Sequence, residues 1–90
     1  MRLEKDLEAA DRKAATKAGW FVEKIMKTGR NGFPDRFYAK DGRVLLVEWK
    51  KPGGRLSDQQ LLRIDQLRAA GVEVHVCDNL EDARVARGDP

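Results

Sequence analysis

The feature that most constrains the fold is the segment 43–50, whose consecutive apolar residues would give a β-strand two apolar faces. It reads Arg-Val-Leu-Leu-Val-Glu-Trp-Lys. Side chains alternate across a β-strand, so each face receives every second residue. One face carries Val44, Leu46, Glu48 and Lys50, and the other carries Leu45, Val47 and Trp49. This pattern predicts a central strand of a sheet whose one face ends in a carboxylate and an ammonium group.

The rest of the chain alternates helical periodicity with β-rich segments and turn signals. Asp41-Gly42 predicts a tight hairpin between the second and third strands. Ser57 and Gln60 form a capping-box pattern at the start of a helix, and Asn79 predicts the cap of a short last helix. We expect helices over 3–18, 58–70 and 80–86, and strands over 20–26, 35–39, 43–50 and 72–77. On the first helix the apolar stripe would be Leu3, Leu7, Ala10, Ala14 and Ala18.

The order of these elements predicts an α/β (α+β) fold with a mixed central sheet flanked by helices. Its 90 residues are enough for one domain. Charged residues make up 37% of the chain, but the net charge is only +3, which excludes a polycationic tail. A single cysteine excludes an internal disulfide and favours a reducing compartment. There is no apolar run of about 18 residues and no signal peptide, so we expect a cytoplasmic protein that does not contact membranes.

Chemistry is predicted where the hairpin brings two strand ends together. Antiparallel pairing places Asp35, at the start of one strand, beside Glu48 and Lys50 at the end of the other. Two carboxylates can hold Mg²⁺, and a lysine can stabilise charge that builds up on a phosphate. The plainer alternatives are a Glu48–Lys50 ion pair at a strand end and a turn aspartate after Pro34.

These residues also occur in a longer ordered pattern that resembles a known family. The sequence has Pro34-Asp35 and, after a gap of 12 residues, Glu48-Trp49-Lys50, as in PD-(D/E)xK nucleases. The stretches 29–36, 47–50 and 52–57, followed by Gln60, resemble the virus-type replication-repair nuclease (VRR-NUC) domain in the same order. The resemblance implies that residues 1–90 form a single nuclease domain with a restriction-endonuclease-like αβββαβ core. Small stand-alone copies of this kind are typical of bacteriophages.

The resemblance also implies a set of active-site residues. The catalytic group would be Glu8, Asp35, Glu48, Lys50 and Gln60. The ligands of Mg²⁺, with Mn²⁺ able to substitute, would be Asp35, Glu48, the backbone carbonyl of Trp49 and, directly or through water, Glu8. Glu4, one helical turn before Glu8, is the alternative first-helix acid. The sequence departs from the family at Phe33 and Trp49, which stand where smaller residues are usual; Phe33 could reshape the substrate entrance.

Several of these residues have structural alternatives. Gln60 could serve only the capping box, and Glu8 could pair with Arg12 on the helix surface. Contacts to DNA phosphates are expected from Lys24, Arg30, Arg36, Lys51 and Arg55, although surface basic residues also serve solubility. His75 and Cys77 are interpreted as strand residues without a catalytic role.

The predicted function is a metal-dependent DNA endonuclease of replication, repair or recombination, with no small-molecule cofactor. By its resemblance it would act on branched DNA such as a Holliday junction, as a homodimer. Trp20, Phe21 or Phe37 could belong to the dimer interface. The alternatives are a non-catalytic nucleic-acid-binding module that retains the nuclease fold, and an antitoxin-like or scaffolding protein.

Overall fold

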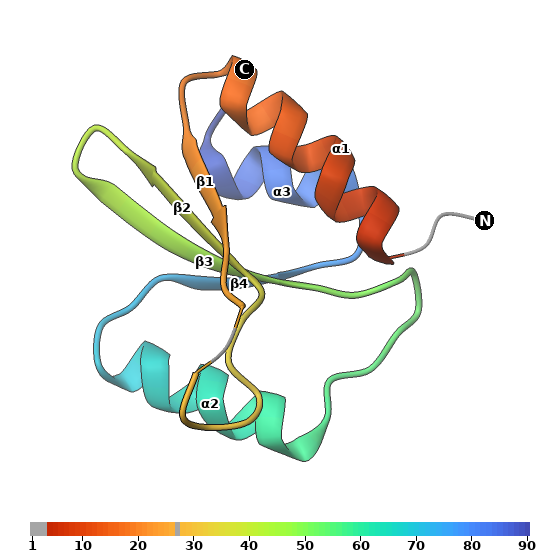
Figure 1. Cartoon of the computed structure of the whole chain (residues 1–90), viewed down its shortest axis with the longest axis vertical. Helices are drawn as coiled ribbons and strands as arrows, with labels where there is room; N and C mark the ends of the chain where they lie inside the picture. Colours follow the sequence, from red (N-terminus) through yellow and green to blue (C-terminus); the bar gives the residue numbers. More distant parts are fainter. Residues whose placement is uncertain (1–3, 27) are drawn as a thin grey trace.

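A computed structural model describes residues 4–26 and 28–90, which form three helices and four strands (Figure 1). The helices are α1 (Glu4–Lys17), α2 (Asp58–Ala69) and α3 (Leu80–Arg87). The strands are β1 (Phe21–Lys24), β2 (Arg36–Lys40), β3 (Arg43–Trp49) and β4 (Val74–Cys77). None of the helices in these ranges has the length and apolar character needed to cross a bilayer.

The four strands form one mixed sheet in the order β1-β2-β3-β4. β1, β2 and β3 are antiparallel, and β4 joins β3 in parallel after the crossover through α2. The β2–β3 hairpin turns at Asp41 and Gly42, whose φ angles are 50° and 80°. Two consecutive residues with positive φ are what a tight hairpin turn needs, and Asp-Gly adopts them at low cost. The α+β fold with a mixed sheet, consistent with a restriction-endonuclease-like core, is therefore confirmed.

Helices cover both faces of the sheet and create two apolar cores (Figure 1). α1 and α3 lie together over one face, where Tyr38, Leu45 and Trp49 are fully buried. α2 lies under the other face, where Ile64 packs with Leu46 of β3 and Val74 of β4. The predicted alternation of β3 is thus correct, and it sends Trp49 into the α1–α3 core.

The expected apolar stripe on α1 is wrong in its register. Ala14 is exposed, and the buried positions are Leu7, Glu8, Asp11 and Ala15. The helix is turned toward a buried acid because Asp11 accepts hydrogen bonds from Tyr38 and from Arg87 of α3. Leu3, the first member of the expected stripe, lies outside the described residues.

The first strand is shorter than the expected 20–26. Trp20 instead packs into the α1–α3 core, and the strand ends at Lys24. The Ile25 amide still donates to the carbonyl of Asp35, the residue just before β2. The residues that precede Asp35 belong to the 28–34 loop, outside the β1–β2 register. β4 is likewise confined to 74–77, whereas Val72 packs against the α2 core.

Candidate active site

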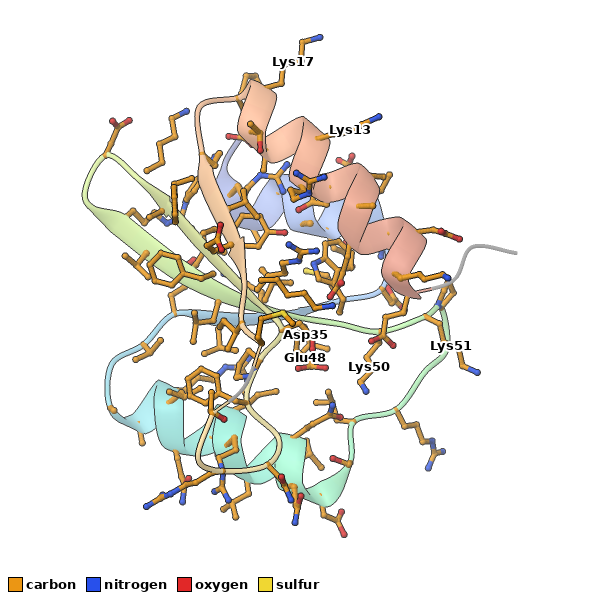
Figure 2. The ribbon with its side chains drawn as sticks, in the orientation of Figure 1. Lys13, Lys17, Asp35, Glu48, Lys50 and Lys51 are labelled. Carbon is orange, nitrogen blue, oxygen red and sulfur yellow. The ribbon has the colours of Figure 1, made fainter. Side chains whose placement is uncertain are left out.

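The hairpin brings Asp35 beside the end of β3, as the sequence predicts. The Asp35 amide donates to the Val47 carbonyl at 3.1 Å, which continues the β2–β3 ladder by one residue. The Asp35 carboxylate accepts from the Trp49 amide at 3.0 Å, so both its backbone and its side chain are held against β3. Asp35 and Glu48 consequently lie together between the sheet and α2, with Lys50 close by (Figure 2).

Glu48 is a buried carboxylate with one engaged and one free oxygen. Its exposure is 1%. Oε2 accepts from Gln60 Nε2 at 3.1 Å and lies 3.9 Å from Lys50 Nζ. Oε1 is buried and has no hydrogen-bond partner among the described residues. Because an unsatisfied buried carboxylate oxygen is costly, this atom points to a missing positively charged or proton-donating ligand.

The environment of Glu48 disfavours its charged form in the protein alone. Burial, followed by the charge of Asp35, raises the pKa of Glu48 to about 8, while the Lys50 ammonium opposes the shift. A buried carboxylate whose pKa is raised beside a second carboxylate is typical of functional sites.

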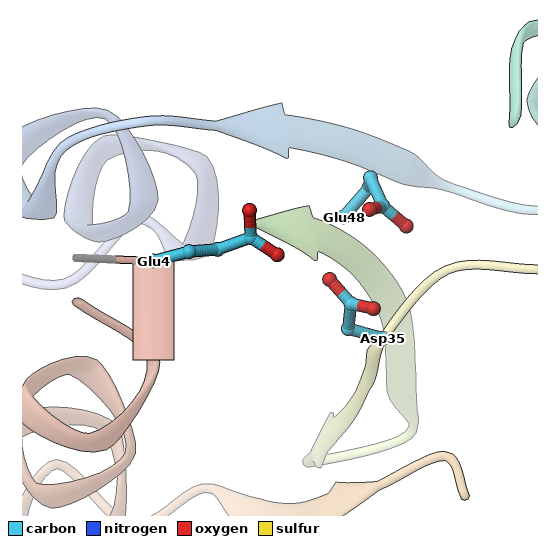
Figure 3. A group of neighbouring side chains, drawn as sticks. All are labelled: Glu4, Asp35 and Glu48. Carbon is cyan, nitrogen blue, oxygen red and sulfur yellow. The ribbon is translucent and has the colours of Figure 1, made fainter. Parts of the chain in front are cut away.

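A third carboxylate completes an acidic group at this point. Glu4, in the first turn of α1, joins Asp35 and Glu48, and one oxygen of each lies within 4.8 Å of the others (Figure 3). Carboxylate oxygens are hard ligands suited to Mg²⁺ or Mn²⁺. Three converging carboxylates, one of which has a buried oxygen without a partner in the described part of the chain, fit a divalent cation. Glu4, Asp35 and Glu48 are hereafter called the acidic triad.

Glu8, the expected first-helix acid, lies outside that triad. Its carboxylate is 3.6 Å from Arg36 and is almost fully buried. Burial and the charge of Asp35 raise the pKa of Glu8, whereas Arg36 and Lys24 lower it. Glu8 therefore borders the site and shares its field, but its one ion pair in the described structure is with Arg36 of β2.

Gln60 performs both of the roles that its position allows. The side-chain Oε1 of Gln60 accepts from the Ser57 backbone amide at 2.9 Å. The backbone amide of Gln60 donates to Ser57 Oγ, which closes the capping box. Its Nε2 donates to Glu48 at the same time. The side chain therefore ties the first turn of α2 to the carboxylate of Glu48.

The predicted DNA-contacting residues differ in how free they are. Lys24, Arg30, Lys51 and Arg55 are exposed. Arg30 lines a hollow together with Asp35, and Lys51 follows Lys50 on the segment that leaves β3 (Figure 2). The Arg36 side chain is only 12% exposed and is held by Glu8.

The other residues considered in the sequence have structural surroundings. His75 hydrogen-bonds Glu73 at 2.7 Å. Burial raises the pKa of Cys77 to about 12. Sequence reasoning missed Arg63, which lies one helical turn after Gln60 and lines a pocket beside the 28–34 loop. Its spacing from Gln60 was the available signal.

An acidic triad beside a lysine at the end of a central strand can hold a divalent cation next to a positive charge. The chain belongs to the VRR-NUC family of nuclease domains, because the family model of the VRR-NUC domain matches residues 2–79. It is also similar to the protein named "Putative nuclease p44" of Acyrthosiphon pisum secondary endosymbiont phage 1. The two are 38% identical over 64 residues, which cover 70% of this chain and 69% of the relative.

Proposed function

We propose that the protein is a metal-dependent endonuclease that hydrolyses phosphodiester bonds in DNA at the acidic triad. The observation that carries the proposal is the convergence of the Glu4, Asp35 and Glu48 carboxylates, together with the buried Oε1 of Glu48 that has no hydrogen-bond partner in the described structure. Membership of a nuclease family and a phage relative with nuclease in its name support the same reading.

The residues have distinct parts in this proposal. Asp35, Glu48, Glu4 and the Trp49 carbonyl would hold Mg²⁺, with Mn²⁺ as a substitute. The bound cation would supply Lewis-acid polarisation of the phosphate and would acidify water. Lys50 carries a positive charge to the same place and can orient the attacking water or stabilise charge on the phosphate. Gln60 holds the Glu48 carboxylate, and Asp35 is fixed by the Trp49 amide.

Glu8 is assigned a positioning role rather than that of a primary ligand. It pairs with Arg36 at the start of β2, next to Asp35, and it is not among the three acids whose oxygens converge, so we assign it contact with the cation only through water. We assign contacts with the phosphates of the DNA to Lys24, Arg30, Lys51 and Arg55, all of which are exposed.

The substrate we propose is branched DNA, including a Holliday junction, cut by a homodimer in the cytoplasm of the host cell. A twofold dimer can cut two strands symmetrically. Phe21 is 59% exposed and Val44 is 45% exposed, and the strand register places them in one row of the sheet. Phe37 contacts Phe21 edge to face. Trp20 is buried within the protomer, which removes it from the candidate interface residues.

Cleavage of labelled four-way junction, splayed-arm and linear duplex DNA tests this proposal, each in EDTA, Mg²⁺ or Mn²⁺. We expect metal-dependent cutting, symmetric on the junction, and its loss by at least about 100-fold in Asp35→Asn and Lys50→Ala. Lys17→Ala removes the same charge at the far end of α1 and should cut normally (Figure 2).

Asp35→Asn should also melt at a higher temperature, because it removes one of three mutually repelling carboxylates.

The alternative is a non-catalytic nucleic-acid-binding module. If folded protein binds these substrates but cuts none of them with either metal, the endonuclease proposal is wrong and the binding module takes its place. Cutting that persists in both variants would instead mean that the site lies elsewhere.

A further inference from the structure

A pocket outside the acidic triad lies between the 28–34 loop and α2. Its volume is about 430 Å³, within the range of pockets that hold small organic groups. The loop contributes Thr28, Gly29, Arg30 and Phe33, and α2 contributes Arg63, Gln66 and Leu67. We call it the loop–α2 pocket.

The chemistry of the loop–α2 pocket suits a flat ring attached to an anion. Phe33 and Leu67 are partly buried and supply an apolar surface. Arg30 and Arg63 supply two guanidinium groups, and none of the lining residues is acidic. Arg63 donates to Gln66 through one terminal nitrogen, while its buried Nε has no partner in the described structure. A nucleobase with its adjoining phosphate combines these two requirements, since bases stack on aromatic rings and guanidinium groups pair with phosphate.

The loop–α2 pocket adjoins a second hollow that reaches Asp35. This hollow, of about 290 Å³, shares Thr28, Arg30 and Phe33 with the loop–α2 pocket. Phe33 therefore lies between the two hollows and lines both of them. A strand whose phosphate lies at Asp35 can place a neighbouring base in the loop–α2 pocket without leaving the surface.

The loop wall of the pocket is fixed before any ligand binds. Gly32 has a φ of 86°, and a side chain there would collide with the Gln59 backbone and lie 2.8 Å from the Gln60 amide nitrogen. Thr28 Oγ1 donates to the Arg30 carbonyl at 2.7 Å. Close backbone packing against α2 and an internal hydrogen bond preorganise the loop, which lowers the cost of binding.

We propose that the loop–α2 pocket receives one unpaired nucleobase of the DNA strand that is cut at the acidic triad. This inference rests on the proposed function and narrows its substrate. A base can enter only where it is not stacked and paired, so the pocket selects branches that carry unpaired nucleotides over continuous duplex.

The test compares binding of splayed-arm DNA with binding of the same DNA lacking one base. Abasic sites are placed one at a time along the single-stranded arm, and dissociation constants are measured in EDTA, so that no cleavage occurs. For the wild-type protein, removal of the base at one position should weaken binding about tenfold. Removal at distant positions should change it little.

Two variants locate the effect. Gly29→Leu fills the pocket; a Cβ at Gly29 meets no atom within 4 Å, and its φ is not in the left-handed region. Gly29→Ala is the matched control, because it makes the same backbone change and leaves the space open. Arg63→Leu removes a guanidinium group from the pocket wall, and Arg55→Leu removes one from the exposed segment outside it.

We expect Gly29→Leu and Arg63→Leu to bind intact and abasic DNA with nearly equal affinity. Gly29→Ala should keep the tenfold difference, and Arg55→Leu should weaken binding to both DNAs equally. The inference is overturned if the wild-type protein shows no sensitive position, or if both pocket variants keep the difference. Cleavage of the same DNAs by the wild-type protein in Mg²⁺ separates the two proposals. Cutting without any base-sensitive position in binding defeats this inference alone, whereas a base-sensitive position without cutting defeats the nuclease proposal.

Discussion

Glu4 and Glu8 lie one helical turn apart on α1, but they face different partners. The oxygens of Glu4 meet those of Asp35 and Glu48, whereas Glu8 pairs with Arg36. Residues four apart share a helix face, so the position at which α1 begins determines which acid lies beside Asp35 and Glu48. The first turn of α1 projects past the end of β3 toward the site (Figure 3), which favours Glu4.

Charge-neutral variants separate the two acids. Glu4→Gln should lower metal-dependent cleavage about 100-fold and raise the Mg²⁺ concentration needed for half-maximal activity, because it removes a ligand oxygen. Glu8→Gln should lower the rate about tenfold at unchanged Mg²⁺ requirement, because it loosens Arg36. Titration of activity with Mg²⁺ measures both quantities. A Mg²⁺ requirement that rises in Glu8→Gln and not in Glu4→Gln would reverse the assignment.

The residues of the site were predictable where two simple rules met. Strand alternation and hairpin pairing were enough to bring Asp35 to Glu48 and Lys50. Glu4 and Arg63 were harder, because their placement depends on how α1 and the 28–34 loop pack in three dimensions. Helical spacing alone makes Glu4 an alternative to Glu8 and puts Arg63 one turn after Gln60, but it does not show which neighbours they meet.

At the scale of elements, the start of α2 is coupled to the end of β3 through Gln60. The same side chain accepts from the Ser57 amide and donates to Glu48. Capping would be possible with glutamate at this position, but a donor to Glu48 would not. Glutamine is therefore explained by the site and not by the helix.

Gln60→Glu tests this coupling. The new carboxylate can still accept from the Ser57 amide, but it faces Glu48 without a donor, so we expect cleavage to fall at least about tenfold. Ser57→Ala is the matched control, since it removes the cap and leaves Glu48 untouched. It should lower the free energy of unfolding by about 1 kcal/mol and cut normally below its melting temperature. Equal losses of activity in the two variants would mean that Gln60 acts only as a cap.

Element order and type followed from local signals, but element faces did not always. The caps at Ser57 and Asn79 are present as predicted. The face of α1 was misjudged because hydrophobic periodicity gives a buried aspartate no weight. Asp11 turns inward since Arg87, 76 residues further along the chain, lies there and pairs with it.

At the scale of the whole molecule, a buried ionic network joins the two ends of the chain. Arg87 Nη1 donates to both oxygens of Asp11 at 2.6 Å, and Tyr38 donates to the same carboxylate at 2.6 Å. The Arg87 Nε donates to Asp89, which also accepts from Trp20. α1 and α3 are thereby fixed to each other and to β2. Because α1 also carries Glu4, the network holds one member of the acidic triad in place.

Loss of the Arg87 guanidinium from this network should lower the free energy of unfolding far more than loss of an exposed guanidinium. Arg87→Ala leaves the Asp11 carboxylate, 1% exposed, without a counter-charge, and should lower the free energy of unfolding by about 3–5 kcal/mol. Arg84→Ala on the same helix breaks an exposed pair with Glu81 and a hydrogen bond to the Asp89 carbonyl, and should lower the free energy of unfolding by only about 1 kcal/mol. Urea unfolding followed by circular dichroism measures both.

The double variant Asp11→Asn with Arg87→Met then tests whether the instability of Arg87→Ala comes from the uncompensated charge of Asp11. It removes both charges, while the amide that replaces the carboxylate retains an acceptor for the Tyr38 hydroxyl, so most of the stability lost in Arg87→Ala should return. If the double variant is as unstable as Arg87→Ala, the arginine stabilises the fold through hydrogen bonds that methionine cannot make, such as the one to Asp89, and not through its charge beside Asp11. If Arg87→Ala itself is no worse than Arg84→Ala, the buried pair does not hold the two helices, and the position of Glu4 must depend on the apolar contacts of Leu7 and Ala15 instead.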